Sequence, residues 1–522
     1  MKTSEVPVLV VGAGAAGTML TLELARRGIE ARTVDRLPGP ATTSRAITVH
    51  SRTAEILERI DPELVGRFLE RAIHNKGYVL HFVDAEGRRS VVRPGIDFTT
   101  TDSSYPYILI HRQDETENFI RDYTRERFGR EPEWSTRCID VRQGDDGVVA
   151  TLVHTDRGDE RETVRCRYLV ACDGINSAVR ETLKLEQDQS DYKGTVLQNL
   201  DAYLHGFPDA EDYVHYCAGT DHFIMVVKLP GGFFRLLLSD RGEAADPNVP
   251  TRVAFMNLVD RHFDGVTLGD TVWHSKWESW VRLAHTYRQG NVFLAGDSAH
   301  VHSTTGGQGM NCCMQDAYNL GWKLAMVLEG TARPELLDTY EQERRPIAEQ
   351  VIWAASSLHE IFMGHGKDIA ERATRMKDKA FVDAVVGRCS GISYTYRDYV
   401  EQPVALSPVP GPAIGDRAPD ADLAGGGTLY GLTRHTGFTL LGLPGRGGAR
   451  PDVEGVLSPF RERYGRVLEA HALDASPSVA AAYGNGGPAR LYLIRPDGYI
   501  GYRCAVDDAE RLEEHLTSSL TL

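Results

Sequence analysis

Glycines near the amino terminus are spaced to hold a phosphate-bearing ligand. The stretch at residues 12–17 (GAGAAG) follows an apolar run at 6–11 and precedes a helical pattern at 18–27, and Asp35 ends the next apolar run, 18 residues beyond Gly17. Glycine lets the backbone approach a pyrophosphate, a helix amino terminus adds partial positive charge, and the acid accepts hydrogen bonds from ribose hydroxyls. These features predict FAD or NAD rather than NADP, with contacts at Gly12, Gly14, Ala15, Ala16, Gly17, Asp35 and Arg36.

Two later segments carry acids and glycines at the ends of apolar runs. Asp173 and Gly174 close the run at 165–172, and Asp297 follows the run at 291–295, ahead of a glycine-rich stretch at 306–311. Asp297 could accept from a ribityl hydroxyl, and backbone amides at a helix start would stabilise a flavin ring that becomes anionic on reduction. Alone, an Asp-Gly turn explains the first segment and a ligand-free loop explains the second. The candidate contacts are Asp173, Gly174, Asp297, Gly307, Gly309, Met310 and Asn311.

Several charged and polar residues between these motifs are further candidates. Arg52 and Glu55 have the i,i+3 spacing of an ion pair at a helix start, so we expect them to be structural. Arg45 has no such simple explanation. Gln113 could hydrogen-bond a cofactor, although a solvated helix start would also account for it.

The elements that must position these residues alternate between strand and helix, which indicates the α/β class. The apolar runs that precede the three motifs are expected to be buried parallel strands of one sheet. Alternating and aromatic runs at residues 214–217, 223–229 and 233–239 predict an antiparallel sheet on the substrate side. Helical periodicity follows at 315–328 and 340–361, a linker rich in Pro and Gly is expected at 395–411, and strands are expected at 438–443 and 491–494.

Composition excludes several classes of function. The formal net charge is −15, without a Lys/Arg stripe, which disfavours nucleic-acid and membrane binding. No apolar run approaches the ~20 residues of a membrane span, and no signal peptide is recognised, so a cytoplasmic protein is expected. The eight cysteines have no CxxC or Cys/His spacing suited to zinc, so we expect reduced, buried thiols and no metal site.

Taken together, the motifs resemble the para-hydroxybenzoate hydroxylase-type (group A) family of FAD-dependent aromatic monooxygenases, in which the three fingerprints occur in the same order. The resemblance covers residues 5–350, including the stretch at 340–346 (YEQERRP). Residues 302–303, 307–311 and 318–324 resemble phenol hydroxylase, whereas residues 45–57 are closer to hydroxylases that tailor aromatic polyketides. Both branches carry a thioredoxin-like carboxyl-terminal domain, and residues 412–522 are similar to it but lack CxxC.

The resemblance implies an architecture. A Rossmann-like FAD-binding domain would be assembled from discontinuous segments at 1–75, 100–181 and 281–350, and a β-sheet substrate domain from 76–99 and 182–280. A helical segment at 351–394 and the linker would precede the thioredoxin-like domain. Relatives often form dimers, so a homo-oligomer is expected.

The resemblance also implies a reaction. NADPH or NADH would dock transiently and reduce FAD, O2 would form a flavin C4a-hydroperoxide, and one oxygen atom would pass to a phenol-like small molecule, with a natural-product intermediate as one option. Residues 12, 14, 17 and 35 would hold the ADP half of FAD, Arg45, Gln113 and Asp297 the pyrophosphate and ribityl chain, and residues 307 and 309–311 the ring edge. Asp173 and Arg180 would serve both nucleotides.

The sequence departs from the family near the reacting centre. Ile47 stands where phenol hydroxylase has an acidic catalytic residue, and Thr304 stands where both branches usually have proline. Thr304, Arg45 and His50 are therefore the candidate catalytic residues, and His215, Tyr216 and Tyr287 are further candidates for phenol deprotonation. Two alternatives remain at this point: a flavin-dependent reductase of the same fold, and a non-enzymatic scaffold.

Overall fold

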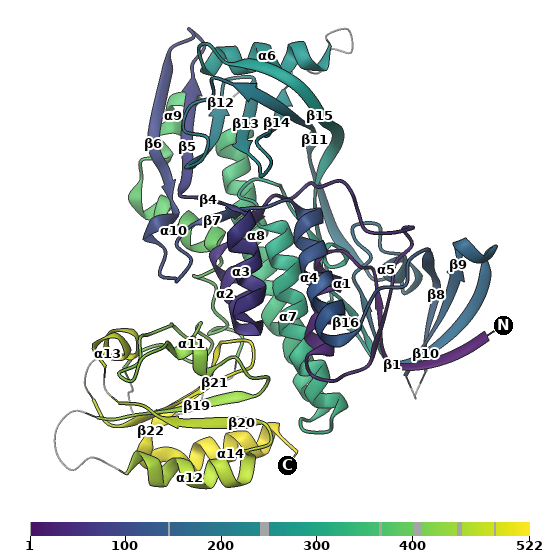
Figure 1. The fold of residues 1–522 in the computed structure, drawn as a ribbon, viewed down its shortest axis with the longest axis vertical. Coiled ribbons are helices and arrows are strands. Elements are labelled where there is room, and N and C mark those ends of the chain that lie inside the picture. Colours follow the sequence, from purple (N-terminus) through teal and green to yellow (C-terminus); the bar gives the residue numbers. More distant parts are fainter. Residues whose placement is uncertain are drawn as a thin grey trace.

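The computed structural model describes residues 2–144, 147–240, 250–364, 368–400, 410–445, 452–474, 476–484 and 487–521. It is a mixed α/β fold in which the described strands form sheets of seven, eight, four and three strands. Figure 1 shows the eight-stranded sheet at one end of the molecule, a layer of long helices in the middle, and the four-stranded sheet of the carboxyl-terminal part at the other end. Of the expected linker at 395–411, residues 401–409 lie outside the described residues.

The seven-stranded sheet places the three motif-bearing strands side by side. Its main path runs β16-β17-β10-β1-β2, and β1 (Lys2–Val11), β2 (Ala31–Val34), β10 (Glu160–Ala171) and β17 (Val292–Leu294) are parallel. The expectation that the apolar runs before the motifs are parallel strands of one sheet is therefore confirmed. The antiparallel neighbours are β16 (Arg288–Gln289), β9 (Gly147–His154) and β8 (Thr136–Gly144).

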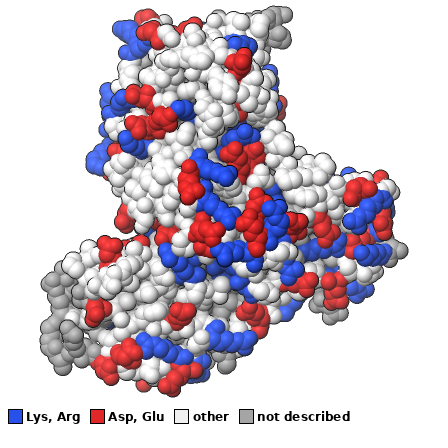
Figure 2. All heavy atoms as spheres, viewed as in Figure 1, with Lys and Arg blue, Asp and Glu red and all other residues white. Residues whose placement is uncertain are grey.

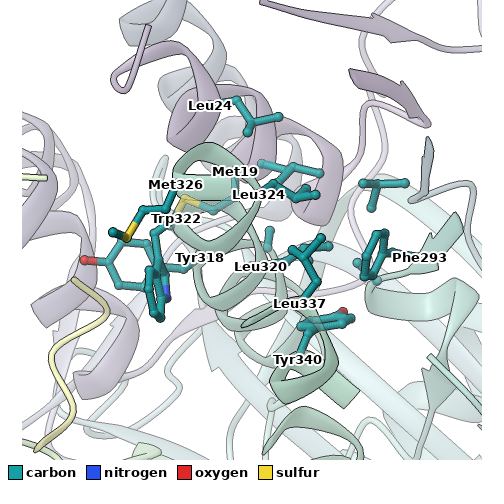
Figure 3. Packing of buried hydrophobic residues seen from close by; sticks show 14 of the residues in the cluster. Met19, Leu24, Phe293, Tyr318, Leu320, Trp322, Leu324, Met326, Leu337 and Tyr340 are labelled. Atoms are coloured by element: carbon teal, nitrogen blue, oxygen red, sulfur yellow. The ribbon is translucent and has the colours of Figure 1, made fainter. Parts of the chain in front are cut away.

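Helices pack against this sheet and against one another. α1 (Ala15–Ala25), α4 (Gln113–Phe128) and α7 (Gly309–Leu328) run alongside each other in the middle of the molecule (Figure 1). α7 is buried on all sides, as an apolar helix inside a large core should be. Figure 3 shows Trp322 and Tyr318 pointing to one side of α7, and Leu320 and Leu324 to the other, toward Phe293, Leu337 and Tyr340. Shorter helices flank this layer: α2 (Ser51–Ile60), α3 (Pro62–Arg71) and α5 (Ala178–Thr182).

The eight-stranded sheet runs β18-β15-β11-β14-β13-β12-β5-β6. Three expected strands are present as β12 (Tyr213–Ala218), β13 (His222–Lys228) and β14 (Phe234–Asp240). One face packs on α6 (Thr251–His262), a helix that the sequence reading did not expect, and the other on α8 (Asp338–Met363). The remaining strands are β5 (Gly77–Val83), β6 (Arg89–Asp97), β11 (Gln187–His205), β15 (Thr267–Ala284) and β18 (His300–Val301); α9 (Ile369–Arg375) and α10 (Lys379–Ser390) follow α8.

Two smaller sheets complete the fold. β3 (Thr48–Val49), β7 (Ile108–Ile110) and β4 (Ile73–Asn75) form the three-stranded sheet. The carboxyl-terminal sheet runs β20-β19-β21-β22, with the expected strands present as β19 (Phe438–Leu443) and β21 (Arg490–Ile494) beside β20 (Leu468–Ala472) and β22 (Ile500–Ala505). α12 (Val453–Tyr464) and α14 (Ala509–Ser519) cover one face, and α11 (Leu429–Leu432) and α13 (Pro477–Tyr483) the other (Figure 1).

Charged residues of both signs share the visible surface, and the cysteines are buried. Figure 2 shows acidic and basic residues interspersed over the face in view. All eight cysteines are free and buried, as expected. Among the described residues, no helix is both long enough and apolar enough to cross a membrane.

Candidate active site

The three sequence motifs meet at the carboxyl ends of β1, β10 and β17. A Cβ atom added to Gly12 would lie 2.2 Å from the carbonyl oxygen of Cys172, so the first loop touches the end of β10. A Cβ atom added to Gly296 would lie 3.0 Å from both the Ala16 Cβ and the Cys313 Sγ atoms. The loop after β17 is thus wedged between the first turns of α1 and α7. Ligands of open α/β sheets bind at such a junction of strand ends.

The first turn of α1 leaves room for a ligand at one glycine and none at another. Gly17 is closed off, because an added Cβ atom would lie 1.8 Å from the Gly12 carbonyl oxygen. Gly14 faces open space, since the nearest atom to an added Cβ is Glu117 Oε1 at 3.8 Å, and no side chain caps the helix there. The Asp35 carboxylate accepts from the backbone amides of Ala13 and Leu37, each at 2.8 Å, so it sits at the same end of the helix. Arg36 is exposed.

Asp297 lies deep in the molecule but is accessible. Burial raises the pKa of this carboxyl, while His300 and Arg45 oppose the rise, and yet its side chain is exposed by surface area. The two observations agree if one side of the carboxylate faces a hollow while protein surrounds the rest of it. The Cys313 thiol donates to Asp297 at 3.4 Å. The guanidinium of Arg45 lies 5.6 Å from the ring centre of Trp277 on β15. Because the charge of Arg45 lowers the pKa of Asp297, these two side chains are close enough to interact.

Gln113 links the segment before β3 to the first turn of α1. Its backbone amide donates to Ser44 Oγ at 2.8 Å, its Oε1 accepts from the Ala46 amide at 3.3 Å, and its Nε2 donates to Glu117 at 2.8 Å. Burial raises the pKa of Glu117 to about 7. The structure adds Glu117 to the residues around Gly14.

The glycine-rich turn before α7 is clamped by β3. Asn311 Oδ1 accepts from the His50 amide at 2.9 Å, and its Nδ2 donates to the Thr48 carbonyl at 2.9 Å. His50 Nε2 donates to the Gly306 carbonyl at 2.9 Å, and burial lowers the pKa of this imidazole to about 4. Because these side-chain groups bind the protein itself, they hold the shape of the turn, and it is the backbone amides at residues 307–310 that lie at the amino terminus of α7. Gly307 and Gly309 are partly exposed and Met310 is buried.

Two polar atoms beside this turn have no partner in the described structure. Thr304 Oγ1 and His302 Nε2 are both inaccessible to solvent and make no hydrogen bond. Burial, with the neighbouring His300, lowers the pKa of His302 to about 4. A buried polar group without a partner is costly, so each of these two atoms is free to hydrogen-bond a ligand beside the turn. In the sequence, His302 stood out only as part of the segment 302–303 that resembles phenol hydroxylase.

Aromatic residues from the eight-stranded sheet meet the turn at Gly306. The rings of Tyr78 and Tyr216 lie 4.6 Å apart, centre to centre, and Phe362 on α8 packs at 4.7 Å from Tyr216. Burial raises the pKa of Tyr216, and hydrogen bonds from the Gly306 amide and Tyr78 oppose the rise. Tyr78 went unnoticed in the sequence, because a tyrosine in a strand that is buried along nearly its whole length has no distinguishing pattern.

The other deprotonation candidates lie away from this turn. His215 faces the α6 side of the sheet, where its Nδ1 bonds to His81 Nε2 at 3.0 Å. Tyr287 is buried 6.0 Å from the Tyr340 ring, behind β17.

The Asp-Gly motif after β10 is connected by hydrogen bonds to the loop after β17. Asp173 Oδ2 accepts from the Val179 amide at 3.3 Å, whereas its Oδ1 has no partner in the described structure; Gly174 has open space around it. Arg180 donates to the carbonyls of Ser298 and Ile175 at 2.8 and 2.7 Å. The guanidinium of Arg180 therefore ties this motif to the loop that carries Asp297.

These features fit FAD: an open glycine, two uncapped helix amino termini, an accessible deep carboxylate and unpartnered polar atoms surround one junction. A buried group of three side chains, His300, Cys312 and Asp316, brings donor atoms within 4.8 Å of one another. However, Arg344 donates to both Asp316 and Cys312, so this group is an ion-pair network with a cation already inside it.

Comparison with known proteins agrees with this geometry. Residues 5–355 match the FAD binding domain family, and residues 411–521 match the aromatic-ring hydroxylase carboxyl-terminal domain. Pentachlorophenol 4-monooxygenase of Sphingobium chlorophenolicum is 36% identical, over 99% of this chain and 97% of that protein. Anhydrotetracycline hydroxylase from Streptomyces rimosus superposes with a TM-score of 0.76 at 28% identity, over 97% of this chain and 98% of the other. Aklavinone-11 hydroxylase, solved with FAD and aklavinone, gives 0.77 at 26%, over 99% of both chains.

The fold and the site thus define a flavoprotein. The chain belongs to the FAD-dependent aromatic-ring hydroxylases, as the resemblance implied. It is a flavin-dependent monooxygenase that uses FAD, with NAD(P)H and O2 as cosubstrates. The relatives support this function rather than the reductase or scaffold alternative.

Proposed function

We propose that this enzyme hydroxylates a phenol-like ring held between the turn at residues 306–309 and the inner face of the eight-stranded sheet. The observation that carries the proposal is the packed aromatic group of Tyr78, Tyr216 and Phe362 on the inner face of the sheet. Its Tyr216 hydroxyl lies close enough to the turn for the Gly306 amide to lower the pKa of that hydroxyl. The monocyclic and polycyclic aromatic compounds in the relatives' names support a substrate of this class.

The proposed division of labour follows the sheets. The seven-stranded sheet with α1, α4 and α7 is the Rossmann-like FAD-binding domain, the eight-stranded sheet with α6 and α8 is the substrate domain, and residues 412–522 form the thioredoxin-like domain. Homo-oligomeric assembly and a cytoplasmic location stay predictions.

The residues around the strand ends would hold the cofactor. Gly14 and the first turn of α1 would receive the pyrophosphate, Asp35 the ribose, and Arg45 and Asp297 the remaining phosphate and ribityl oxygens. When bound and reduced, FAD would activate O2, so that one oxygen atom of O2 enters the ring and the other leaves as water. The protein's task is then to orient the ring, exclude water and hold the phenolic proton.

Three side chains are placed for that task. Thr304 would offer its unpartnered hydroxyl to the ligand beside the turn. Tyr216, neutral because burial raises its pKa, would hydrogen-bond the substrate hydroxyl, with Tyr78 behind it. His50 stays neutral at pH 7 and fixes Gly306 through Nε2, which keeps the turn in register with Tyr216.

The test is coupled turnover on a panel of phenols, measured as substrate-stimulated NAD(P)H oxidation, H2O2 release and product mass. Tyr216→Phe and Thr304→Val should divert NAD(P)H oxidation toward H2O2 while FAD stays bound. Tyr203→Phe is the matched control, because Tyr203 is 42% exposed on β11 and lies outside the site. Stoichiometric H2O2 with every phenol, or full coupling in both site variants, would refute the proposal.

A further inference from the structure

A turn of the carboxyl-terminal domain is inserted against the helices of the cofactor domain. Residues 495–498 connect β21 to β22, and the Asp497 carbonyl accepts from Arg52 Nη2 at 2.7 Å. The Pro496 carbonyl accepts from the Tyr318 hydroxyl at 3.2 Å, and the Asp497 carboxylate accepts from Trp322 Nε1 at 3.3 Å. The turn therefore binds both α2 and α7.

Arg495 on this turn is the centre of a buried charge cluster. Its guanidinium makes two bonds to the Glu343 carboxylate, at 2.6 and 2.7 Å, and a further bond to Asp497 at 2.6 Å. Lys323 Nζ donates to Glu343 at 2.8 Å. Although burial alone would raise it, Arg495 and Lys323 lower the pKa of Glu343 to about 2. All four groups are shielded from solvent.

A second buried cluster lies directly beneath the loop that carries Asp297. The Asp316 carboxylate on α7 accepts from the Gly296 amide at 3.2 Å, from His300 Nε2 at 2.7 Å and from Arg344 Nε at 2.8 Å. The loop is thus held from below by one carboxylate, whose position depends on two cations.

One hydroxyl group joins the two clusters. Tyr396 Oη accepts from Arg344 Nη1 at 3.3 Å and from Asn319 Nδ2 at 3.5 Å. The same Asn319 amide reaches Glu343 at 2.8 Å and Asp497 at 3.1 Å. The Tyr396 ring also lies 5.4 Å from the Arg495 guanidinium. A continuous buried path therefore runs from Arg495 to the Gly296 amide.

We propose that the carboxyl-terminal domain positions the Asp297 loop for FAD through this path, with Arg495 and Tyr396 as positioning residues. Buried charges keep their geometry only while every partner stays in place, so displacement at one end moves the groups at the other. In this view, a domain without CxxC contributes to cofactor affinity by electrostatics and not by thiol chemistry. The inference rests on the proposed role of Asp297 in binding FAD.

Tyr396→Phe is the sharpest test, because it removes the linking hydroxyl and keeps the ring. We expect about a fivefold rise in the FAD dissociation constant of the apoprotein, as for one lost hydrogen bond, with a changed visible circular dichroism of bound flavin. The thermal unfolding midpoint of the apoprotein should fall as well, because the buried Arg344 Nη1 donor loses its acceptor, so the two flavin readings decide the test. A purely structural role for Tyr396 would move the midpoint and leave the flavin signal as it is.

Arg495→Gln should give a larger rise, of tenfold or more, and Arg495→Lys should restore part of the affinity. Arg463→Gln is the control: it removes an exposed arginine of the same domain, paired with Glu513, and should change neither reading. If Arg495→Gln does not fold, Tyr396→Phe alone decides.

Asp297→Ala distinguishes a failure of the proposed FAD site from a failure of the proposed positioning role. If it leaves FAD affinity unchanged, the proposed role of the loop is wrong, and the inference fails with it. If Asp297→Ala weakens FAD binding but Tyr396→Phe leaves both the dissociation constant and the flavin signal unchanged, the cofactor site stands and the positioning role is refuted.

Discussion

Gly14 and Gly17 lie one turn apart in the same motif, yet alanine should act on them in opposite ways. At Gly14, an added Cβ meets nothing closer than 3.8 Å, and the φ of −75° suits any residue. At Gly17, an added Cβ lies 1.8 Å from a backbone oxygen, where only movement of the chain can relieve the clash.

The magnitudes follow from these contacts. Gly14→Ala loses some helix-capping preference but restricts the unfolded chain, two effects of about 1 kcal/mol that nearly cancel. Its methyl group would fill the space in which the pyrophosphate must approach the helix. We expect the FAD dissociation constant to rise tenfold or more, which is about 1.4 kcal/mol. Gly17→Ala forces two backbone segments apart and should lower the free energy of unfolding of the apoprotein by about 3 kcal/mol.

Urea unfolding of the apoprotein and fluorescence titration with FAD measure the two effects separately. The expected pattern is a stable Gly14→Ala variant that binds FAD poorly, and a destabilised Gly17→Ala variant. If Gly14→Ala binds FAD as tightly as the original chain, the first turn of α1 is not the place where the pyrophosphate lies.

Three further results are expected. His50, with its pKa lowered by burial from 6.5 to about 4, contributes stability at neutral pH that is lost as pH falls from 6.5 to 4, about 2 kcal/mol between pH 7 and pH 5; unfolding curves of His50→Gln should show a shallower loss, and an unchanged slope would contradict this. Glu343→Gln leaves two buried cations with less compensation and should cost about 3 to 5 kcal/mol by urea unfolding, whereas Glu349→Gln, 50% exposed, should cost under about 1 kcal/mol; equal costs would be evidence against the cluster. Asp35→Ala should weaken FAD binding in the same titration without loss of helical circular dichroism, and unchanged affinity would remove the ribose assignment.

The motif-bearing part of the fold was predictable because its chemistry is local. The glycine spacing at residues 12–17, the acid at 35 and the apolar runs before each motif each depend on a short stretch of chain. The run at 438–443 is buried along its whole length and could be read the same way. In contrast, β15 alternates between half-buried and exposed residues over much of its length, and α6 has little amphipathic pattern. Both lie mostly or wholly in the segment 182–280 that was expected to form a sheet, but neither was predicted as a separate element.

The residues of the candidate site were likewise predictable only where the signal lies in a short stretch of chain. Asp297 and Arg45 were found because a motif or an unusual charge marked them. The contact of Tyr216 with Gly306, the clamp between Asn311 and Thr48, and the place of Arg495 all depend on pairings across many residues. No spacing rule in one sequence contains that information.

The order of the central strands has a consequence for how the enzyme is made. β1 pairs with β2, which follows it closely in the sequence. The other neighbour of β1 is β10, and β10 pairs in turn with β17, which lies more than 100 residues further along the chain. Contacts between such distant segments form slowly. A ribosome must therefore release more than half of the chain before the three loops can converge, so nascent protein should be colourless, and flavin capture should come late in biogenesis, once the long central helix after β17 has docked.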